Sequence, residues 1–280
     1  MFVLNQHQNM AITIAIANEK GGVAKTTTTA SLGSILADKG YKVVMVDLDP
    51  QGDLTTGLNK EFDERNIYDS IFTHKQMSAT NVNPGLVLIG GDSRMNPVSF
   101  DKSAVADRDF KYITHGILKK ALESLKDQAD LILLDCPPNV DIVTANALIA
   151  SDYVIIPTEA HKFAINGIES ILSEMGTLKS QNPNLSLLGI LITRYRGNTA
   201  IHSQMEEALR EKYSGQVFKT PIKENITLQE VSHEGQEIVA YDKERQSGQL
   251  VKSKFAGIKD YEQVAEELLS IIFHNETKPD

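Results

Sequence analysis

The fold is decided by one stretch near the beginning of the chain, which reads Ala15-Ile16-Ala17-Asn18-Glu19-Lys20-Gly21-Gly22-Val23-Ala24-Lys25-Thr26-Thr27. The apolar run at residues 12–17 predicts a buried strand. The two glycines allow a tight loop whose backbone can approach a ligand closely. The hydroxyl-rich run that follows predicts a helix to about residue 39. This order is typical of a phosphate-binding loop, because free N–H groups and the helix dipole favour an anion.

The side chains of this loop fit phosphate chemistry, with two departures from the pattern G-x-x-x-x-G-K-[ST]. We expect Lys25 on the terminal phosphates and the Thr26 hydroxyl on Mg²⁺. Glu19 and Ala24 stand where the pattern has glycines, and a second lysine, Lys20, precedes Lys25 by five residues. A simple glycine turn is the alternative. Two lysines, a hydroxyl run and flanking elements occur together, however, and this combination favours phosphate binding.

Carboxylates close two further predicted strands. The apolar segment at residues 41–52 carries Asp47 and Asp49, and the segment at residues 130–138 carries Asp135 before two prolines. Ligands bind at the carboxyl ends of strands in an open parallel sheet. Asp47 and Asp49 are two positions apart and therefore share a side if the strand continues. For Asp47 and Asp49 the alternative is a polar turn with an acidic cap.

Together these three motifs resemble those of the ParA/MinD family of ATPases, and the resemblance extends over about residues 12–269. It implies that Lys20 reaches across a dimer to the partner's nucleotide, while Lys25 acts in cis. It also implies that Asp49 positions the attacking water and that Asp47 and Asp135 support Mg²⁺ together with Thr26. The implied nucleotide contacts are Lys20, Gly21, Gly22, Val23, Ala24, Lys25, Thr26 and Thr27, with Lys223 and Asn225 beside the adenine.

The C-terminal third is similar to the family but departs from it at two arginine positions. Family members commonly have Ile-Pro-Arg-Asn where this chain has Ile222-Lys223-Glu224-Asn225, and Thr227 stands where relatives carry an arginine linked to DNA binding. DNA contacts would then come from other basic side chains. The candidates are Arg194, Arg196, Lys252 and Lys254.

Strands that alternate with helices predict an α/β fold with a doubly wound, mostly parallel sheet and helices on both faces. Further strands are predicted at residues 86–89, 153–159, 185–193 and 217–220. Further helices are predicted at residues 66–72, 110–126, 141–149, 164–179, 200–213, 227–233 and 260–273. We expect a mobile N-terminal arm at residues 1–9, a single ATPase domain at residues 10–274 and a tail at residues 275–280.

Composition limits the function classes. The net charge of −9 argues against strong standing affinity for nucleic acid, although residues 186–260 are nearly neutral and leave room for a basic face. The single cysteine, Cys136, permits no intrachain disulfide and indicates a reducing cytosol. It also argues against nitrogenase-type reductases and metalloid pumps, which need several cysteines. No apolar run approaches the length of a membrane span, and the acidic residues of the last predicted helix oppose binding to anionic lipid.

The resemblance implies an ATPase, with ATP and Mg²⁺, that segregates DNA. An ATP-bound homodimer would bind double-stranded DNA non-specifically and would be released by hydrolysis, which a ParB-type centromere-binding protein would accelerate. Such a protein would be cytoplasmic, nucleoid-associated in its ATP state and without a membrane partner. The alternative is a MinD-like positioning or regulatory ATPase that acts on a protein partner.

Overall fold

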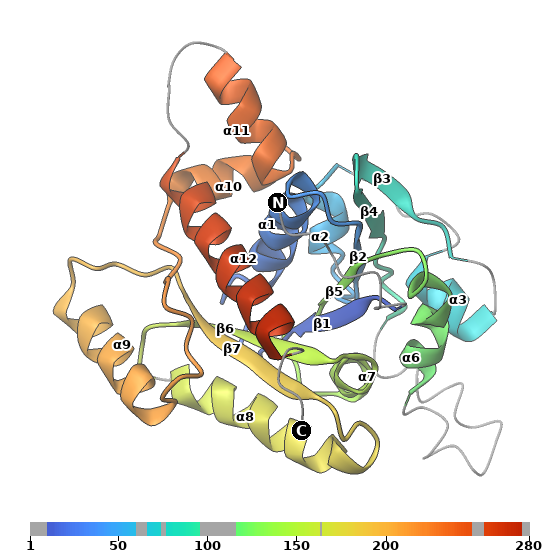
Figure 1. The fold of residues 1–280 in the computed structure, drawn as a ribbon, viewed down its shortest axis with the longest axis horizontal. Helices are drawn as coiled ribbons and strands as arrows, with labels where there is room; N and C mark the ends of the chain where they lie inside the picture. Colours follow the sequence, from blue (N-terminus) through green and yellow to red (C-terminus); the bar gives the residue numbers. More distant parts are fainter. Residues whose placement is uncertain are drawn as a thin grey trace.

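The computed structural model describes residues 10–59, 66–73, 77–95, 116–162, 164–247 and 255–275. Its centre is a seven-stranded sheet in the order β3-β4-β2-β5-β1-β6-β7 (Figure 1). The strands are β1 Ile12–Ile16, β2 Val43–Asp47, β3 Thr80–Asn83, β4 Leu86–Ile89, β5 Leu131–Asp135, β6 Tyr153–Glu159 and β7 Ser186–Thr193. All neighbouring strands pair in parallel except β3 and β4. The predicted mostly parallel sheet is therefore confirmed.

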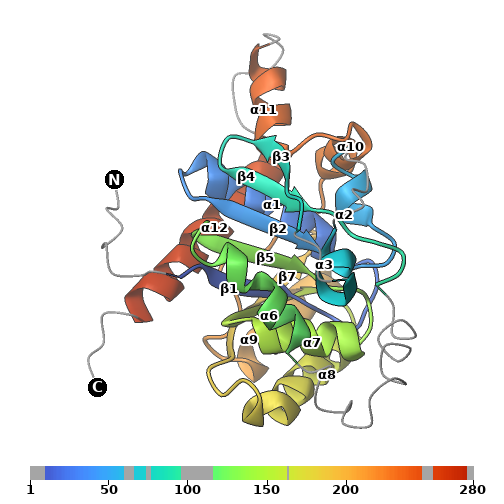
Figure 2. The same ribbon diagram turned by 90° about the vertical axis from the view of Figure 1, so that its right-hand side faces the viewer.

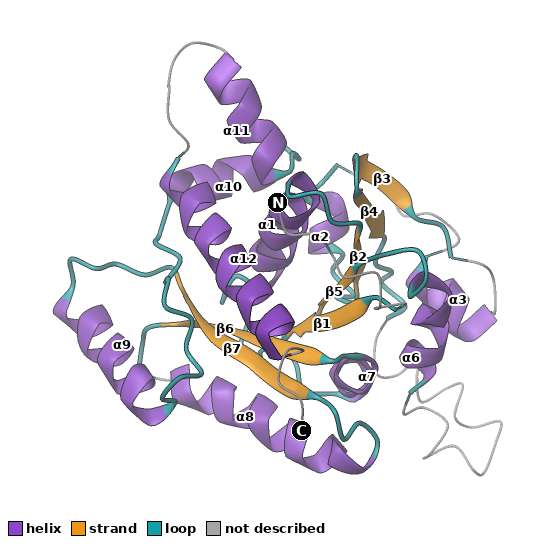
Figure 3. Cartoon of the chain, in the orientation of Figure 1, coloured by secondary structure: helices purple, strands orange, loops and turns teal. Residues whose placement is uncertain are grey.

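Helices cover both faces of this sheet, as predicted (Figure 2). They are α1 Lys25–Asp38, α2 Asp53–Thr56, α3 Ile67–Thr73, α6 Ile117–Leu122, α7 Ile142–Ala150, α8 Ala164–Thr177, α9 Ala200–Lys212, α10 Ile226–His233, α11 Ile238–Ser247 and α12 Ala256–Asn275. Helices α7 and α8 lie on one side of the strands, and α1 and α12 lie on the other (Figure 3).

Strand β1 shows how the sequence builds two hydrophobic cores. Ile12, Ile14 and Ile16 join the cluster that includes side chains of α1 and α12, whereas Ala15 and Ala17 join the cluster that includes side chains of α7 and α8. Successive side chains of a strand point to opposite faces of the sheet. Because helices cover both faces, the strand reads as a continuous apolar run rather than an alternating one.

The last helix, α12, packs on the core. Tyr261, Val264, Leu268 and Ile272 of α12 are fully buried, and the Tyr261 hydroxyl lies 3.1 Å from Thr28 Oγ1 in α1. The helix begins at Ala256, earlier than the predicted residue 260. Within the described residues, none of the helices combines the length and the apolar character needed to span a membrane.

One predicted strand, at residues 217–220, is wrong. Only an isolated bridge joins Val217 to Ile190 there. Side chains from helices bind the backbone that a strand partner would otherwise bind: Arg210 donates to the carbonyls of Phe218 and Lys219, and the Glu267 carboxylate accepts from the N–H groups that follow. These contacts are distant in sequence, so local periodicity cannot reveal them.

Several other elements differ from the sequence-based expectations or cannot be compared with them. The sequence did not predict β3, α2 or α11, which are short or of mixed polarity. The helix predicted at residues 110–126 is described only from residue 116. The N-terminal arm, most of the C-terminal tail, Lys252 and Lys254 lie outside the described residues.

Thr13 on β1 provides a test of core packing. Its side chain is fully buried, and its hydroxyl has no hydrogen-bond partner among the described residues. Burial of an unpaired hydroxyl costs about 1–3 kcal/mol. We therefore expect Thr13→Val, which keeps the shape of the side chain, to raise the free energy of unfolding by about 1 kcal/mol in urea titrations. A decrease would show that the hydroxyl has a partner.

Candidate active site

The loop between β1 and α1, residues 17–24, holds a lysine ammonium against its own backbone. Gly22 (φ 78°) and Ala24 (φ 63°) both adopt the left-handed conformation, which costs a non-glycine residue about 1–2 kcal/mol. The Lys25 Nζ atom donates to the Lys20 carbonyl at 2.9 Å. Lys25 is buried, and this burial lowers the pKa of its ammonium. An arriving phosphate would offer that ammonium a charged acceptor in place of the carbonyl.

The Asn18 side chain holds this loop in place through two hydrogen bonds. The sequence did not identify Asn18 as a site residue. Its Oδ1 accepts from the Lys20 N–H at 3.0 Å, and its Nδ2 donates to the Pro157 carbonyl at 2.7 Å. A Cβ atom at Gly167 would lie 2.4 Å from Asn18 Oδ1, so α8 can approach only with a glycine there. The Thr193 hydroxyl lies 3.1 Å from the Val23 carbonyl on the other side. The sequence signal that could have identified Asn18 is its position between an apolar strand and two glycines.

Asp47 and Asp135 lie side by side at the carboxyl ends of β2 and β5, where they are register partners. Both are fully buried. Burial raises the pKa of Asp47 to about 6, and burial together with the Asp47 charge raises the pKa of Asp135 well above its ordinary value. Because the folded state binds the Asp47 proton more tightly than the unfolded chain, its contribution to the free energy of unfolding falls as pH rises through 6. Such a pair favours a bound cation.

The free oxygen of this pair belongs to Asp135. Its Oδ1 accepts from the Thr29 hydroxyl at 3.2 Å, whereas its buried Oδ2 has no hydrogen-bond partner among the described residues. The nearby Thr26 side chain acts against the rise in the pKa of Asp135. In the described part of the chain, no three His, Cys, Asp or Glu side chains converge to hold a metal. One hydroxyl and one carboxylate suit Mg²⁺, which keeps several waters and takes phosphate oxygens as ligands.

Asp49 stands in the loop that follows β2, close to the same carboxylates. Its N–H donates to Asp47 Oδ1 at 3.2 Å, and its own Oδ1 accepts from the Gln51 N–H at 2.9 Å. Burial raises its pKa, and the Lys25 charge acts in the opposite direction. The structure thus brings Lys25, Asp49 and Asp135 together from three separate segments.

A cavity of about 260 Å³ adjoins the loop on the side of the C-terminal segment. Its lining includes Ala24 of the loop and Thr27 of α1, together with Lys223 and Asn225. The predicted adenine residues therefore reach the phosphate loop. Asn225 also accepts a hydrogen bond from the Thr227 N–H at 2.8 Å, at the start of α10. A second cavity of about 450 Å³ lies beyond Thr27, between α1, α2 and α10.

Both arginines predicted to contact DNA have carboxylate partners in this structure. Arg194 lines the 260 Å³ cavity, and its NH1 atom lies 3.2 Å from Glu159 Oε1. Arg196 is exposed but forms a two-pronged ion pair with Glu224. Either guanidinium would have to leave or share its carboxylate to bind a DNA phosphate. Local sequence patterns could not predict these two ion pairs, because each arginine and its carboxylate partner lie far apart in the sequence.

Known proteins are similar to this chain over most of its length. The model of a family described as "AAA domain" matches residues 11–187. The sporulation initiation inhibitor protein Soj of Bacillus subtilis is 35% identical over 236 residues, which cover 82% of this chain and 90% of the relative. The chromosome partitioning protein ParA of Caulobacter vibrioides is 30% identical over 265 residues, which cover 92% of this chain and 93% of the relative.

Solved structures share the fold. A cobyrinic acid a,c-diamide synthase of Mycobacterium smegmatis with bound ADP and magnesium superposes with a TM-score of 0.76 at 27% identity, covering 96% of this chain and 98% of the other. A putative plasmid partition protein of Borrelia burgdorferi bound to AMPPNP gives 0.73 at 25% identity, covering 95% and 99%. With its two-lysine phosphate loop and carboxylates on neighbouring strands, the chain belongs to the ParA/MinD family of P-loop ATPases.

Proposed function

We propose that this protein hydrolyses ATP with Mg²⁺ at the phosphate loop and uses the cycle to segregate DNA. The loop from Lys20 to Thr27 would hold the phosphates, with Lys25 as the main cation. The base would lie in the cavity that Lys223 and Asn225 line. The observation that carries the proposal is the convergence of Lys25, Asp49 and the open Asp135 oxygen at one edge of the sheet.

The metal would be held by Thr26 and Asp135, and Asp47, the register partner of Asp135, would support the site. Mg²⁺ would supply charge neutralisation at the phosphates. Asp49 would orient the attacking water, because it is a carboxylate held by Gln51 in a fixed position near Lys25. Lys25 would bind the phosphate oxygens and thereby favour the negative charge that develops on them.

The nucleotide cycle would control whether the protein is a dimer. Lys20 of each protomer would contact the other protomer's phosphates, so ATP would hold two subunits face to face. Two weak phosphate-binding faces on one dimer bind DNA far better than one. Hydrolysis, accelerated by a ParB-type centromere-binding protein, would release the dimer from the nucleoid into the cytoplasm. The similarity of the chain to a Soj protein and to a chromosome partitioning protein ParA supports this role.

A regulatory or positioning ATPase acting on a protein partner is the second candidate. The observation that favours it is the pairing of Arg194 with Glu159 and of Arg196 with Glu224. Each carboxylate reduces the charge available to a DNA phosphate. The net charge of −9 acts in the same direction.

DNA retention separates the two candidates. We expect the wild-type protein to bind random duplex DNA with ATP but not with ADP, and to lose binding between about 50 and 200 mM salt, because neutralised phosphates release counterions.

Lys20→Gln should bind ADP normally yet fail to form the ATP dimer in light scattering, and it should therefore not be retained on DNA. Lys119→Gln, on the exposed face of α6, is the matched control.

Two results would contradict the segregation role. The first is an ATP-bound dimer that ignores DNA at low salt while it hydrolyses ATP normally, which would favour the protein-partner candidate. The second is a Lys20→Gln protein that dimerises as well as the wild type, which would remove the role of Lys20 across the interface.

A further inference from the structure

The two buried carboxylates at the site, Asp47 and Asp135, differ in the hydrogen bonds that their oxygens accept. Both oxygens of Asp47 are already hydrogen-bonded within the chain. Oδ2 accepts from the Thr55 N–H at 2.9 Å and from the Thr55 hydroxyl at 2.6 Å, and Oδ1 accepts from the Asp49 N–H. Asp135, in contrast, keeps an oxygen without a partner among the described residues. Asp47 is therefore committed to the loop that carries Asp49.

Thr55 connects this carboxylate to a third segment of the chain. Its hydroxyl oxygen accepts from the Gly91 N–H at 2.9 Å, just beyond the end of β4. Since the Gly91 N–H is the donor there, the hydroxyl proton is directed to Asp47. A Cβ atom at Gly91 would lie 2.8 Å from Asp47 Cγ, so only a glycine allows the backbone to lie this close. Thr55 itself is fully buried.

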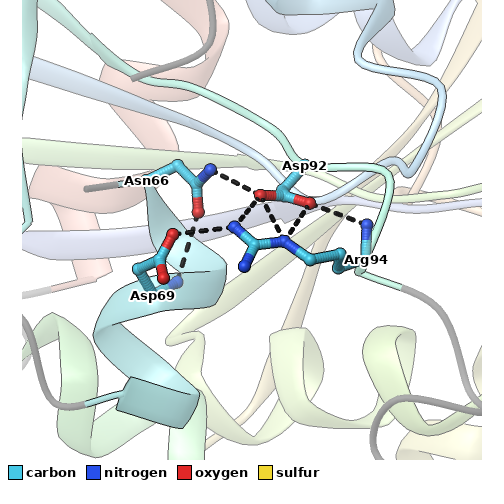
Figure 4. Close-up of polar contacts among 4 residues, drawn as sticks. All are labelled: Asn66, Asp69, Asp92 and Arg94. Carbon is cyan, nitrogen blue, oxygen red and sulfur yellow. Dashed lines mark hydrogen bonds and ion pairs between the residues drawn. The ribbon is translucent and has the colours of Figure 1, made fainter. Parts of the chain in front are cut away.

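A polar cluster fixes the segment that Gly91 belongs to. Figure 4 shows Arg94 between the carboxylates of Asp92 and Asp69, with Asn66 beside Asp92. Arg94 Nε donates to Asp92 Oδ1 at 2.9 Å, and Arg94 NH2 lies 2.8 Å from Asp69 Oδ2 on α3. Asn66 Nδ2 donates to Asp92 Oδ2 at 2.6 Å. The segment after β4 is thus held to α3, and the position of the Gly91 N–H is set from outside the nucleotide site.

We propose that Thr55 is a positioning residue for ATP hydrolysis. Its hydroxyl, fixed by Gly91, orients the Asp47 carboxylate, whose other oxygen holds the backbone of Asp49. The Asp49 side chain is thereby presented to the phosphate site in one orientation. The inference rests on the proposed function, because it assigns Thr55 to the same reaction.

Two substitutions test the hydroxyl separately from the shape of the side chain. Thr55→Val keeps the shape of the side chain and the N–H bond to Asp47, whereas Thr55→Ser keeps the hydroxyl and loses a methyl group. We expect Thr55→Val to lower kcat by about 10–100-fold, since a displacement of about 1 Å at a catalytic group costs up to about 10²-fold. The KM for Mg·ATP and the Kd for ADP should change by less than about twofold, because Thr55 lies outside the phosphate loop. Thr55→Ser should restore most of kcat.

Thr13→Val is the matched control, because it makes the same change at another fully buried threonine, on β1. It should leave kcat unchanged. Thermal unfolding of each variant shows whether it is folded, and Thr55→Ala, which introduces no bulk, takes the place of Thr55→Val if that variant does not fold.

The outcomes separate the positioning role from the reaction itself. Wild-type kcat in the folded Thr55→Val or Thr55→Ala variant would overturn the positioning role while leaving the ATPase intact. Failure of Thr55→Ser to restore kcat, or a loss of ADP binding in Thr55→Val, would assign Thr55 a purely structural role. Absence of Mg²⁺-dependent turnover in the wild-type protein would instead overturn the proposed function, and the positioning role with it.

Discussion

Replacement of Lys25 by alanine is expected to weaken ATP binding by about 10²–10⁴-fold. The ammonium would form at least two charge-assisted hydrogen bonds to the phosphates, each worth about 1.5–3 kcal/mol, and about 1.4 kcal/mol corresponds to a tenfold change in Kd. The structure already holds the ammonium inside the loop, on the Lys20 carbonyl. Little side-chain entropy would therefore be lost when the phosphates arrive. Titration calorimetry with ATP and Mg²⁺ measures the effect.

The controls must separate lost binding from lost folding. Lys25 partly offsets the charge of Asp135, so its removal also affects the unliganded protein. Lys25→Gln keeps the length of most of the side chain and provides a second variant, and thermal unfolding reports on the fold of each. Lys212→Ala, which breaks an exposed ion pair with Glu169, should leave Kd unchanged. Equal ATP affinity in the wild type and in a folded Lys25 variant would remove the phosphate-loop assignment.

Loss of the Asp49 carboxylate should slow turnover by about 10²–10⁴-fold, the usual contribution of a residue that acts as a base or orients water. Two variants distinguish charge from geometry. Asp49→Asn keeps an acceptor for the Gln51 N–H and hence the shape of the loop, while Asp49→Ala removes it. Both should bind ATP as the wild type does, because Asp49 is not a main phosphate contact. Steady-state phosphate release and ATP titrations measure the two quantities.

The same variants should remain as ATP dimers and stay on DNA longer than the wild type, because hydrolysis is the releasing step. Asp127→Asn, at an exposed turn, is the control substitution. Unchanged turnover in Asp49→Asn would mean that another group orients the water. Lost ATP binding in Asp49→Asn would make Asp49 a structural residue or a direct metal ligand.

Strong local patterns in the sequence predicted most of the fold. The apolar runs of β1, β2 and β5 are buried throughout, those of β6 and β7 are buried except at their ends, and each strand forms within its predicted segment. Residues 217–220 have a similar apolar, β-branched pattern but do not form a strand. Arg210 and Glu267 satisfy their backbone instead, and both lie on helices. Helix α11 was not predicted because charged and polar residues dominate it.

The sequence by itself determined the glycine loop between strand and helix, most of the strands and helices, and the three carboxylates at or just after strand ends. Each of these depends on neighbours within a few positions, through the loop's glycines, the helix start or the strand period. Only the tertiary structure decided how the carboxylates differ. Thr55 and Gly91 reach Asp47 from other segments, while one Asp135 oxygen keeps no partner among the described residues. The pairing of Arg194 with Glu159 is of the same kind, because parallel strands bring distant residues to one edge of the sheet.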